Sequence, residues 1–318
     1  MSEILRGAFE RCAALRERTD AYRLIDADGT EIPALTVEAY GQYAVLVPYD
    51  EEALSEARRL ADGLLDLGFL GVYLKAHLKS SSGAALSSGV RSGEGVPLCG
   101  QPAPDSFEVH EEQQRILIWL NEAQATGLFL DQRDNRARIR ADAQGKRALN
   151  LFCYTGSFTV AAAMGGAVST VSVDTSARAL RRTGENLALN GAAPAAHRLL
   201  KDDARKWLGR AVRRAERFDW IILDPPSFSR MGSDSFSVAK DYATMARQSL
   251  ELLAGGGQLL AVTNHRSTSA DALIALLQHA ATACRRKIAS IELQPPPVDC
   301  RNAQGGSATK SVLLRVAQ

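Results

Sequence analysis

The sequence predicts an α/β fold in which the C-terminal part of the chain forms a mostly parallel sheet. From residue 147 onward, β-branched and aromatic runs alternate with helical patterns, as they do in successive strand–helix–strand units. Residues 149–176 read as a strand, a tight turn at 154–157, a small-residue helix and a second strand that ends in Asp174. In an open parallel sheet, this arrangement binds a nucleoside-containing ligand at the carboxyl edge.

The expected elements of this part follow one another with short connections. Strands and helices are expected to alternate at 147–153, 157–164, 168–174, 176–189, 197–201, 203–215, 218–223, 236–254, 258–263, 270–283, 289–294 and 311–317. The last strand follows a loop from Pro295 to Thr309 that contains no helical pattern. Because no helix separates it from the preceding strand, the last strand can insert antiparallel.

The N-terminal part has a different pattern. Residues 1–20 form a charged amphipathic segment that predicts a helix, and residues 21–126 predict a small α/β domain, which we interpret as a candidate substrate-binding module. Residues 127–140, which carry arginines at 133, 136, 138 and 140, are expected to link it to the remainder. We therefore expect a larger domain over 127–318.

Length, charge and cysteine usage limit the classes of function. A chain of 318 residues predicts two domains, and a net charge of +2 gives no bulk argument for nucleic-acid binding. There is no run of 18 uninterrupted apolar residues and no apolar signal core at the N-terminus, so no membrane association is expected. The five cysteines are scattered without metal-type spacing. We expect a reduced cytoplasmic protein without a metal; the oligomeric state stays open.

A single glycine in the turn distinguishes two classes of nucleoside-containing ligand. The dinucleotide fingerprint GxGxxG, whose extra glycines let backbone amides approach a pyrophosphate, is missing here. S-adenosylmethionine has no phosphate, so one glycine beside its methionyl group is enough. The turn thus favours methyl transfer over hydride transfer, with cofactor contacts expected from Phe152, Tyr154, Thr155, Gly156, Ser157 and Phe158. Cys153 reads as a small buried residue.

Acidic residues follow the next two expected strands. The two oxygens of Asp174 can accept hydrogen bonds from both ribose hydroxyls, and Asp174 can also cap the helix that Thr175 and Ser176 open. Asp202 and Asp203 follow the strand at 197–201, where a carboxylate can meet the adenine amine. We favour Asp203 for that contact and Asp202 for a helix cap. All five residues are expected to belong to the cofactor site.

A second motif, Asp224-Pro225-Pro226-Ser227-Phe228, ends the apolar run at 218–223. Its two prolines fix φ and lack N–H donors, so the turn is rigid and rich in acceptors. The carboxylate and the carbonyls can accept hydrogen bonds from an exocyclic amine or a ring N–H, and Phe228 can stack on a planar base. Aligning a nitrogen lone pair with a sulfonium methyl supplies most of the catalysis. Asp224 is therefore the candidate catalytic residue and also a cofactor contact; the plainer alternative is a turn that only ends a strand.

Four stretches together resemble the bacterial class I S-adenosylmethionine-dependent methyltransferases of 23S ribosomal RNA, the group with the 5-methylcytosine and 7-methylguanine enzymes. They are TGLFLDQRDNR (126–136), NLFCYTGSF (150–158), VSVDTS (171–176) and DPPSF (224–228). The resemblance covers most of the chain and implies a Rossmann-like domain with a seven-stranded sheet, S-adenosylmethionine as cofactor and an extruded base as target. It also implies that Gln132, Arg133 and Arg136 help close the methionyl pocket, although composition alone would place them on a solvated helix face.

Two departures from this family bear on the chemistry. The family's cytosine enzymes begin with an RNA-binding PUA domain, whereas about twenty helical residues precede the small domain here, a short form. The cytosine C5 reaction also needs a cysteine nucleophile just after the fifth core strand, where this chain has Asn264. Cys284 and Cys300 come later and are out of register. We therefore expect methylation of a base nitrogen, guanine favoured, with Asn264 at the base edge and ribosomal RNA or a pre-ribosomal particle as partner.

Two other functions stay open at this stage. One is a class I methyltransferase that acts on a small molecule or a protein, with the small domain as a lid; the missing PUA domain and the near-neutral charge favour it. The other is a non-catalytic cofactor- or RNA-binding module, against which the intact acidic and DPP motifs argue. An RNA-active enzyme is expected to gather basic side chains beside the pocket, namely Arg133, Arg136, Arg138, Arg181, Arg182, Arg205 and Lys206.

Overall fold

The computed structural model describes residues 3–29, 31–76, 95–121, 125–226, 230–231, 234–235, 238–302 and 304–318. The chain divides into two compact units, Met1–Arg133 with Pro297–Ser307 and Asp134–Pro296 with Ala308–Gln318. The second domain was expected to be continuous over 127–318; residues 127–133 and 297–307 instead belong to the first unit. An ion pair between Arg133 and Asp299 joins these two segments, with N···O distances of 2.7 and 2.9 Å.

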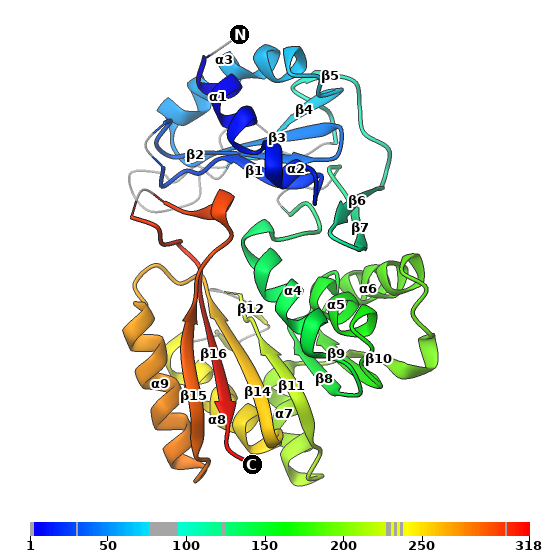
Figure 1. Ribbon diagram of the computed structural model, residues 1–318, viewed down its shortest axis with the longest axis vertical. Coiled ribbons are helices and arrows are strands. Elements are labelled where there is room, and N and C mark those ends of the chain that lie inside the picture. Colours follow the sequence, from blue (N-terminus) through cyan, green and yellow to red (C-terminus); the bar gives the residue numbers. More distant parts are fainter. Residues whose placement is uncertain are drawn as a thin grey trace. The chain divides into compact units, whose positions relative to one another are not determined.

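The first unit contains a five-stranded sheet in the order β1-β2-β3-β4-β5, in which β3 and β4 are parallel and the other neighbours antiparallel. Its strands are β1 (Ala21–Ile25), β2 (Leu35–Tyr40), β3 (Tyr43–Pro48), β4 (Gly71–Leu74) and β5 (Cys99–Gly100). Helices α1 (Glu3–Arg11) and α3 (Glu51–Asp66) pack their apolar sides on one face of this sheet (Figure 1). The unit also contains α2 (Ala13–Arg16), the hairpin β6 (Phe107–Glu111) and β7 (Gln114–Ile118), and the short helices η1 (Leu130–Gln132) and η3 (Val298–Cys300).

The second unit is built on a seven-stranded sheet in the order β10-β9-β8-β11-β14-β16-β15. The strands are β8 (Arg147–Leu151), β9 (Ser169–Asp174), β10 (His197–Lys201), β11 (Phe218–Leu223), β14 (Leu253–Thr263), β15 (Ile288–Gln294) and β16 (Lys310–Val316). β16 pairs antiparallel with both β14 and β15, while β8, β9, β10, β11 and β14 pair parallel with one another. The predicted fold class and the antiparallel insertion of the last strand are both confirmed.

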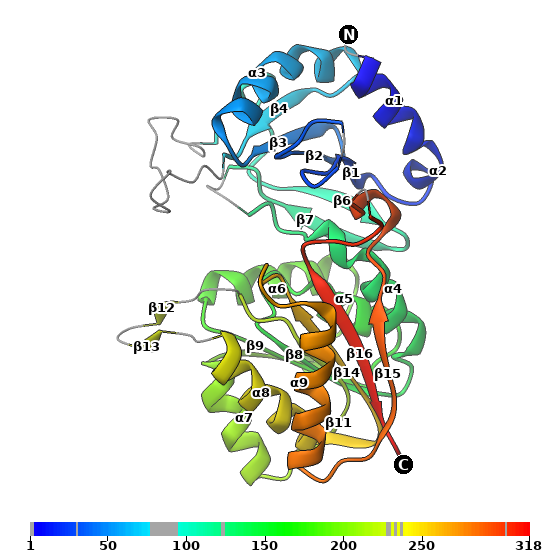
Figure 2. The ribbon, with the colours of Figure 1, turned by 90° about the vertical axis from the view of Figure 1, so that its left-hand side faces the viewer.

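Helices cover both faces of this sheet (Figures 1 and 2). One face packs against α4 (Arg133–Asp142) and α5 (Ser157–Met164), with α6 (Ala177–Leu189) beside α5; the other packs against α7 (Ala204–Arg213), α8 (Val238–Leu252) and α9 (Ala270–Ala283). The short helix η2 (Pro194–Ala196) precedes β10, and β12 (Arg230–Met231) pairs with β13 (Asp234–Ser235). Among the described helices, none has both the length and the apolar character needed to cross a membrane.

Part of the expected linker 127–140 is a helix packed on the sheet. Residues 133–142 form helix α4, which buries Ile139 against Trp220 and its neighbours on the sheet. Ile139 and Ala143, four residues apart, lie on the same face and are both fully buried.

Candidate active site

The site residues expected at the strand ends lie at one edge of the seven-stranded sheet. Parallel strands present their carboxyl ends on the same side, and β9, β8, β11 and β14 are consecutive neighbours. Leu151 pairs with both Val173 and Leu223, and Leu223 pairs with Ala261, so the four strands end nearly level. The structure therefore brings together at this edge Asp174, the last residue of β9, and the segments that begin at Phe152, Asp224 and Asn264.

The turn after β8 has an unusual backbone. Phe152 and Tyr154 adopt positive φ values of 58° and 49°, and Gly156 follows at 78°. A side-chain-bearing residue in this region costs about 1–3 kcal/mol, so surrounding contacts must hold the conformation. The carbonyl of Cys153 accepts the amide of Gly156 at 2.8 Å, which closes the turn, and the Tyr154 amide donates to Asp174 Oδ2 at 3.0 Å.

Helix α6 holds the same turn from the other side. Thr183 Oγ1 donates to the Tyr154 carbonyl at 3.0 Å, and Asn186 Nδ2 donates to the Thr155 carbonyl at 2.9 Å. Both side chains are fully buried. The sequence-based reasoning missed these two residues. A signal was present, since they are polar positions within the otherwise apolar stripe that Ala179, Leu180 and Leu187 bury.

The glycine of the turn is required by packing. A Cβ at Gly156 would lie 2.3 Å from Thr183 Cγ2, so no larger residue fits against α6, and its positive φ adds a second requirement. The other residues expected from the turn vary in exposure: Thr155 and Phe158 are buried, whereas Ser157, which begins α5, and Phe152 are partly exposed. The role of these residues in cofactor contact stays a prediction.

Asp174 lies half-buried at the tip of β9 with each carboxylate oxygen engaged once. Oδ1 accepts the amide of Ser176 at 2.8 Å and Oδ2 accepts that of Tyr154. A carboxylate has about four acceptor sites, so both oxygens can accept further hydrogen bonds. The helix cap is a different residue: Ser176 precedes α6 and its Oγ accepts the Ala179 amide at 3.2 Å. Thr175 is exposed.

Asp202 was expected to cap the helix that follows β10, and this expectation was wrong. Asp203 caps α7, accepting the Arg205 amide at 2.8 Å, and its carboxylate also accepts the Arg205 guanidinium at 2.8 Å. Burial raises the pKa of Asp203, but the hydrogen bonds from Arg205 outweigh this effect and lower it. Asp202 accepts the Asp203 amide and pairs with Arg210. Helix geometry selects the cap because the residue immediately before Ala204 has the extended backbone that a cap requires.

Asp224 follows β11 directly and is half-buried, with Pro225 buried and Pro226 exposed behind it. Tyr242 of α8 is buried and donates to the Val262 carbonyl at 3.0 Å. Burial and the charge of Asp224 raise the Tyr242 pKa well above its ordinary value, so the phenol stays a neutral donor. Asn264 follows β14 and is exposed. Ser227 and Phe228, expected to contact the base, lie outside the described residues.

The residues expected to close the methionyl pocket are all buried, so the alternative of a solvated helix face is wrong. Gln132, Arg133 and Arg136 are 2%, 4% and 1% exposed. Arg133 donates to both oxygens of Asp299 and to the Ala21 carbonyl, all within the first unit. Arg136 lies 6.0 Å from the centre of the Phe158 ring in the second unit. Their contact with the cofactor stays a prediction.

The basic residues expected to cluster do not do so. Arg205 and Lys206 lie on α7, which packs on the face of the sheet opposite α4. Three others, Arg133, Arg136 and Arg182, are buried, and Arg205 is paired with Asp203. The buried and paired guanidinium groups are not available to contact RNA. These seven residues therefore do not form an RNA-binding face.

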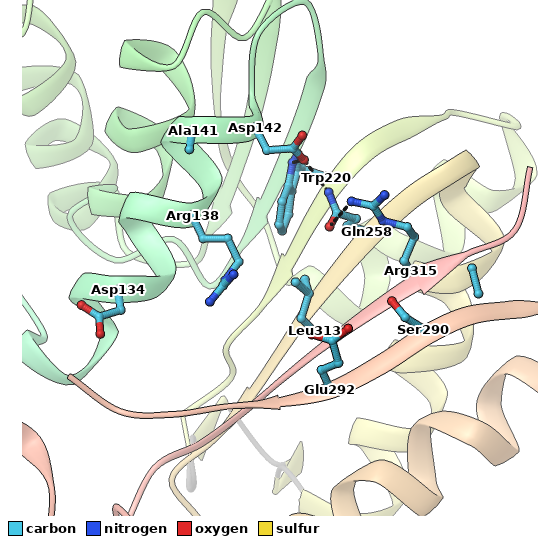
Figure 3. Close-up of a pocket in the computed structure, with 11 residues that line it drawn as sticks. Asp134, Arg138, Ala141, Asp142, Trp220, Gln258, Ser290, Glu292, Leu313 and Arg315 are labelled. Atoms are coloured by element: carbon cyan, nitrogen blue, oxygen red, sulfur yellow. Dashed lines mark hydrogen bonds between the residues drawn. The ribbon is translucent and has the colours of Figure 1, made fainter. Parts of the chain in front are cut away.

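A polar hollow of about 790 Å³ lies on the α4 face of the sheet, away from the carboxyl edge (Figure 3). Arg138 of α4 points into it, and Trp220, Gln258 and Arg315 form its wall, in register across three adjacent strands. Among the expected site residues that the structure describes, none lines this hollow. Asp142 closes one end and accepts hydrogen bonds from Trp220 Nε1 at 2.9 Å and Gln258 Nε2 at 2.5 Å.

Comparison with known proteins agrees with this geometry. Residues 91–315 match the model of a family described as S-adenosylmethionine-dependent methyltransferase. The chain is 31% identical to ribosomal RNA large subunit methyltransferase I of Erwinia tasmaniensis, covering 88% of this chain and 69% of that protein. It is 38% identical to ribosomal RNA large subunit methyltransferase K/L of Chromohalobacter salexigens, over 80% of this chain and 34% of that protein. The crystal structure of SMU.776 complexed with SAH superposes with a TM-score of 0.84 at 30% identity, covering 99% of this chain and 80% of that one.

Proposed function

We propose that this chain, which belongs to the S-adenosylmethionine-dependent methyltransferases, methylates a base nitrogen of large-subunit ribosomal RNA, with guanine favoured. The enzyme class and the cofactor, S-adenosylmethionine, follow from the family. The ribosomal substrate is supported by the relatives, two of which are named as large-subunit ribosomal RNA methyltransferases. Such a substrate would place the enzyme in the cytoplasm.

The residues at the carboxyl edge fit the proposed cofactor. Asp174 retains acceptor capacity on both carboxylate oxygens, which suits two ribose hydroxyls. Asp202 and Asp203 each pair with an arginine, but the Asp202 side chain is 30% exposed, whereas that of Asp203 is 9% exposed and also caps α7. Asp202, which follows the neighbouring strand β10, therefore suits the adenine amine better. In this proposal Asp174 and Asp202 hold the nucleoside, and the turn 152–156 borders the methionyl group.

The observation that carries the proposed N-methylation is the absence of an accessible thiolate at this edge. All five cysteines lie in the described part of the chain. Cys153, the one beside the turn, is 6% exposed, and burial together with the Asp174 charge raises its pKa to about 12. Cys284 follows α9 at the opposite end of the sheet. The other three cysteines, Cys12, Cys99 and Cys300, belong to the first unit, and burial raises the thiol pKa of each. A cytosine C5 reaction needs a thiolate to attack the ring, whereas a base nitrogen is itself the nucleophile.

The chain's own groups then orient the base. When bound, the cofactor supplies an electrophilic methyl group on a sulfonium sulfur. The Asp224 carboxylate and the Pro225 carbonyl accept hydrogen bonds from N–H groups of the base, which aligns the nitrogen lone pair with that methyl. Any proton that an attacking amine releases would pass to solvent. Asn264, at the end of the adjacent strand, contacts a base edge.

The proposal is tested by mapping modified nucleosides in ribosomal RNA from a deletion strain by mass spectrometry. We expect the loss of one methylated base, and its return when the purified enzyme and S-adenosylmethionine are added to the RNA or to ribosomal particles. Return on only one of these two substrates identifies the assembly state that the enzyme recognises. Loss of 5-methylcytosine would overturn the chemistry, and unchanged ribosomal RNA would favour a small-molecule or protein substrate.

A further inference from the structure

The buried residues of helix α6 include polar side chains where packing alone would place apolar ones, and two of them contact the turn after β8. Thr183 and Asn186 are three residues apart, lie on the same side of the helix, and have no exposed surface. Burying a hydroxyl and an amide is unfavourable unless both form hydrogen bonds. Their partners are two consecutive carbonyls, those of Tyr154 and Thr155 in the turn after β8.

The contacts of Tyr154 connect this helix face to Asp174. The Tyr154 carbonyl accepts from Thr183, and the Tyr154 amide donates to Asp174 Oδ2 at 3.0 Å. Tyr154 adopts a φ of 49°, which an L-residue rarely adopts without such support. Thr183 therefore holds the residue whose amide in turn holds the carboxylate.

Gly156 and Thr183 also depend on each other sterically. The Thr183 side chain occupies the space where a Cβ of Gly156 would lie, at 2.3 Å from Cγ2 and 2.8 Å from Oγ1. The Thr183 hydroxyl lies within hydrogen-bond distance of both the Tyr154 and the Ala179 carbonyl, at 3.0 and 3.1 Å. If the Thr183 hydroxyl is removed, the Ala179 carbonyl still accepts the Thr183 N–H within the helix. The Tyr154 carbonyl, in contrast, loses its side-chain donor.

We propose that Thr183 and Asn186 are positioning residues for cofactor binding. They fix the backbone of residues 154–156 and, through the Tyr154 amide, the direction of the Asp174 carboxylate toward the ribose. This inference rests on the proposed placement of the cofactor at this edge. Neither residue touches the cofactor, so their effect is on its affinity and not on the transfer step.

The test compares the affinity of matched variants for S-adenosylmethionine and SAH by titration calorimetry. Thr183→Val keeps the shape and removes the hydroxyl, whereas Thr183→Ser keeps the hydroxyl. Thr170→Val is the matched control, because Thr170 is 1% exposed and its hydroxyl lies 3.0 Å from His197 Nδ1, at the end of β9 far from Asp174. We expect a roughly tenfold rise in Kd for Thr183→Val, about 1.4 kcal/mol, and less than threefold for the other two.

Two further variants separate the possible failures. Asn186→Leu, which removes the donor to Thr155, is expected to raise Kd as Thr183→Val does, and it keeps the test usable if one variant folds poorly. Asp174→Ala reports on the placement of the cofactor itself. Equal Kd values for Thr183→Val and Thr170→Val overturn the positioning role. If Asp174→Ala also leaves Kd unchanged, the cofactor does not bind at this edge. The proposed cofactor placement is then wrong, independently of the positioning role.

Discussion

Two aspartates at opposite edges of the seven-stranded sheet, Asp142 and Asp174, are held in different ways. At the amino edge, Asp142 accepts hydrogen bonds from Trp220, Gln258 and Lys146, three side chains from different elements. At the carboxyl edge, each oxygen of Asp174 accepts one backbone amide, so both oxygens keep acceptor capacity. A carboxylate whose acceptor sites are filled by side chains holds elements together, whereas one held only by backbone can be aimed at a ligand.

The backbone next to the two aspartates also differs. Positive φ values occur at both edges, at Ala215 and Arg285 as well as at Phe152 and Tyr154, but the latter two lie next to Asp174, while α4 reaches Asp142 as regular helix. Strained backbone persists where neighbouring contacts hold it, and here buried polar groups of α6 provide those contacts. The comparison predicts that substitutions at the carboxyl edge change function and that those at the amino edge change stability.

The largest effect is expected from Asp224→Ala. Loss of the carboxylate removes the group that orients the base nitrogen, and misorientation of a reacting group costs roughly 10²–10³-fold in kcat. Single-turnover methylation of the RNA identified by nucleoside mapping measures this loss, and titration calorimetry is expected to show a cofactor Kd within about threefold of wild type. A comparable loss of cofactor affinity would instead place Asp224 in the cofactor site.

Asp174→Ala is expected to act on affinity. Two ribose hydroxyls lose a charged acceptor, worth about 2–3 kcal/mol in all, which raises the cofactor Kd roughly 30–150-fold. Asp174→Asn, which keeps one carbonyl oxygen, is expected to fall between this variant and wild type. Calorimetric titration with SAH measures the series. A fall in kcat with an unchanged cofactor Kd would instead assign Asp174 to the transfer step, which is the role proposed for Asp224.

Periodicity and strand-end positions allowed most of the second unit to be predicted. Alternating strands and helices are local patterns, and residues after parallel strands must meet at one edge whatever the packing. Contacts between distant segments could not be predicted in this way. The Arg133–Asp299 pair joins residues 166 apart in the sequence, and the partners of Thr183 depend on how α6 approaches the turn. The cap of α7 was assigned to the wrong aspartate because the helix was expected to begin at residue 203, one residue before its observed start at Ala204.

The smallest effect is expected at the amino edge, where a substitution is expected to lower stability and to leave cofactor binding unchanged. Asp142→Ala leaves Trp220 Nε1 and Gln258 Nε2, whose side chains are 1% and 4% exposed, without their acceptor. We expect a loss of about 1–2 kcal/mol in the free energy of unfolding, measured in urea, because the Asp142 side chain is 40% exposed and water can replace part of the interaction. The cofactor Kd is expected to stay at the wild-type value, and a rise would show that the two edges are coupled.

The contribution of Asp142 is also expected to depend on pH in one direction. Burial raises the pKa of Asp142, but hydrogen bonds from Lys146, Trp220 and Gln258, with the Lys146 charge, lower it below its ordinary value of 3.8. A carboxyl with a lower pKa in the folded state stabilises the fold above its unfolded pKa, and this is lost as the pH falls through the folded value. The stability difference between wild type and Asp142→Ala is therefore expected to stay constant from pH 7 to about 5 and to shrink below about 4. A difference that grows on acidification would mean that the Asp142 pKa is raised in the folded state, and that the amino-edge carboxylate is not held by its three donors.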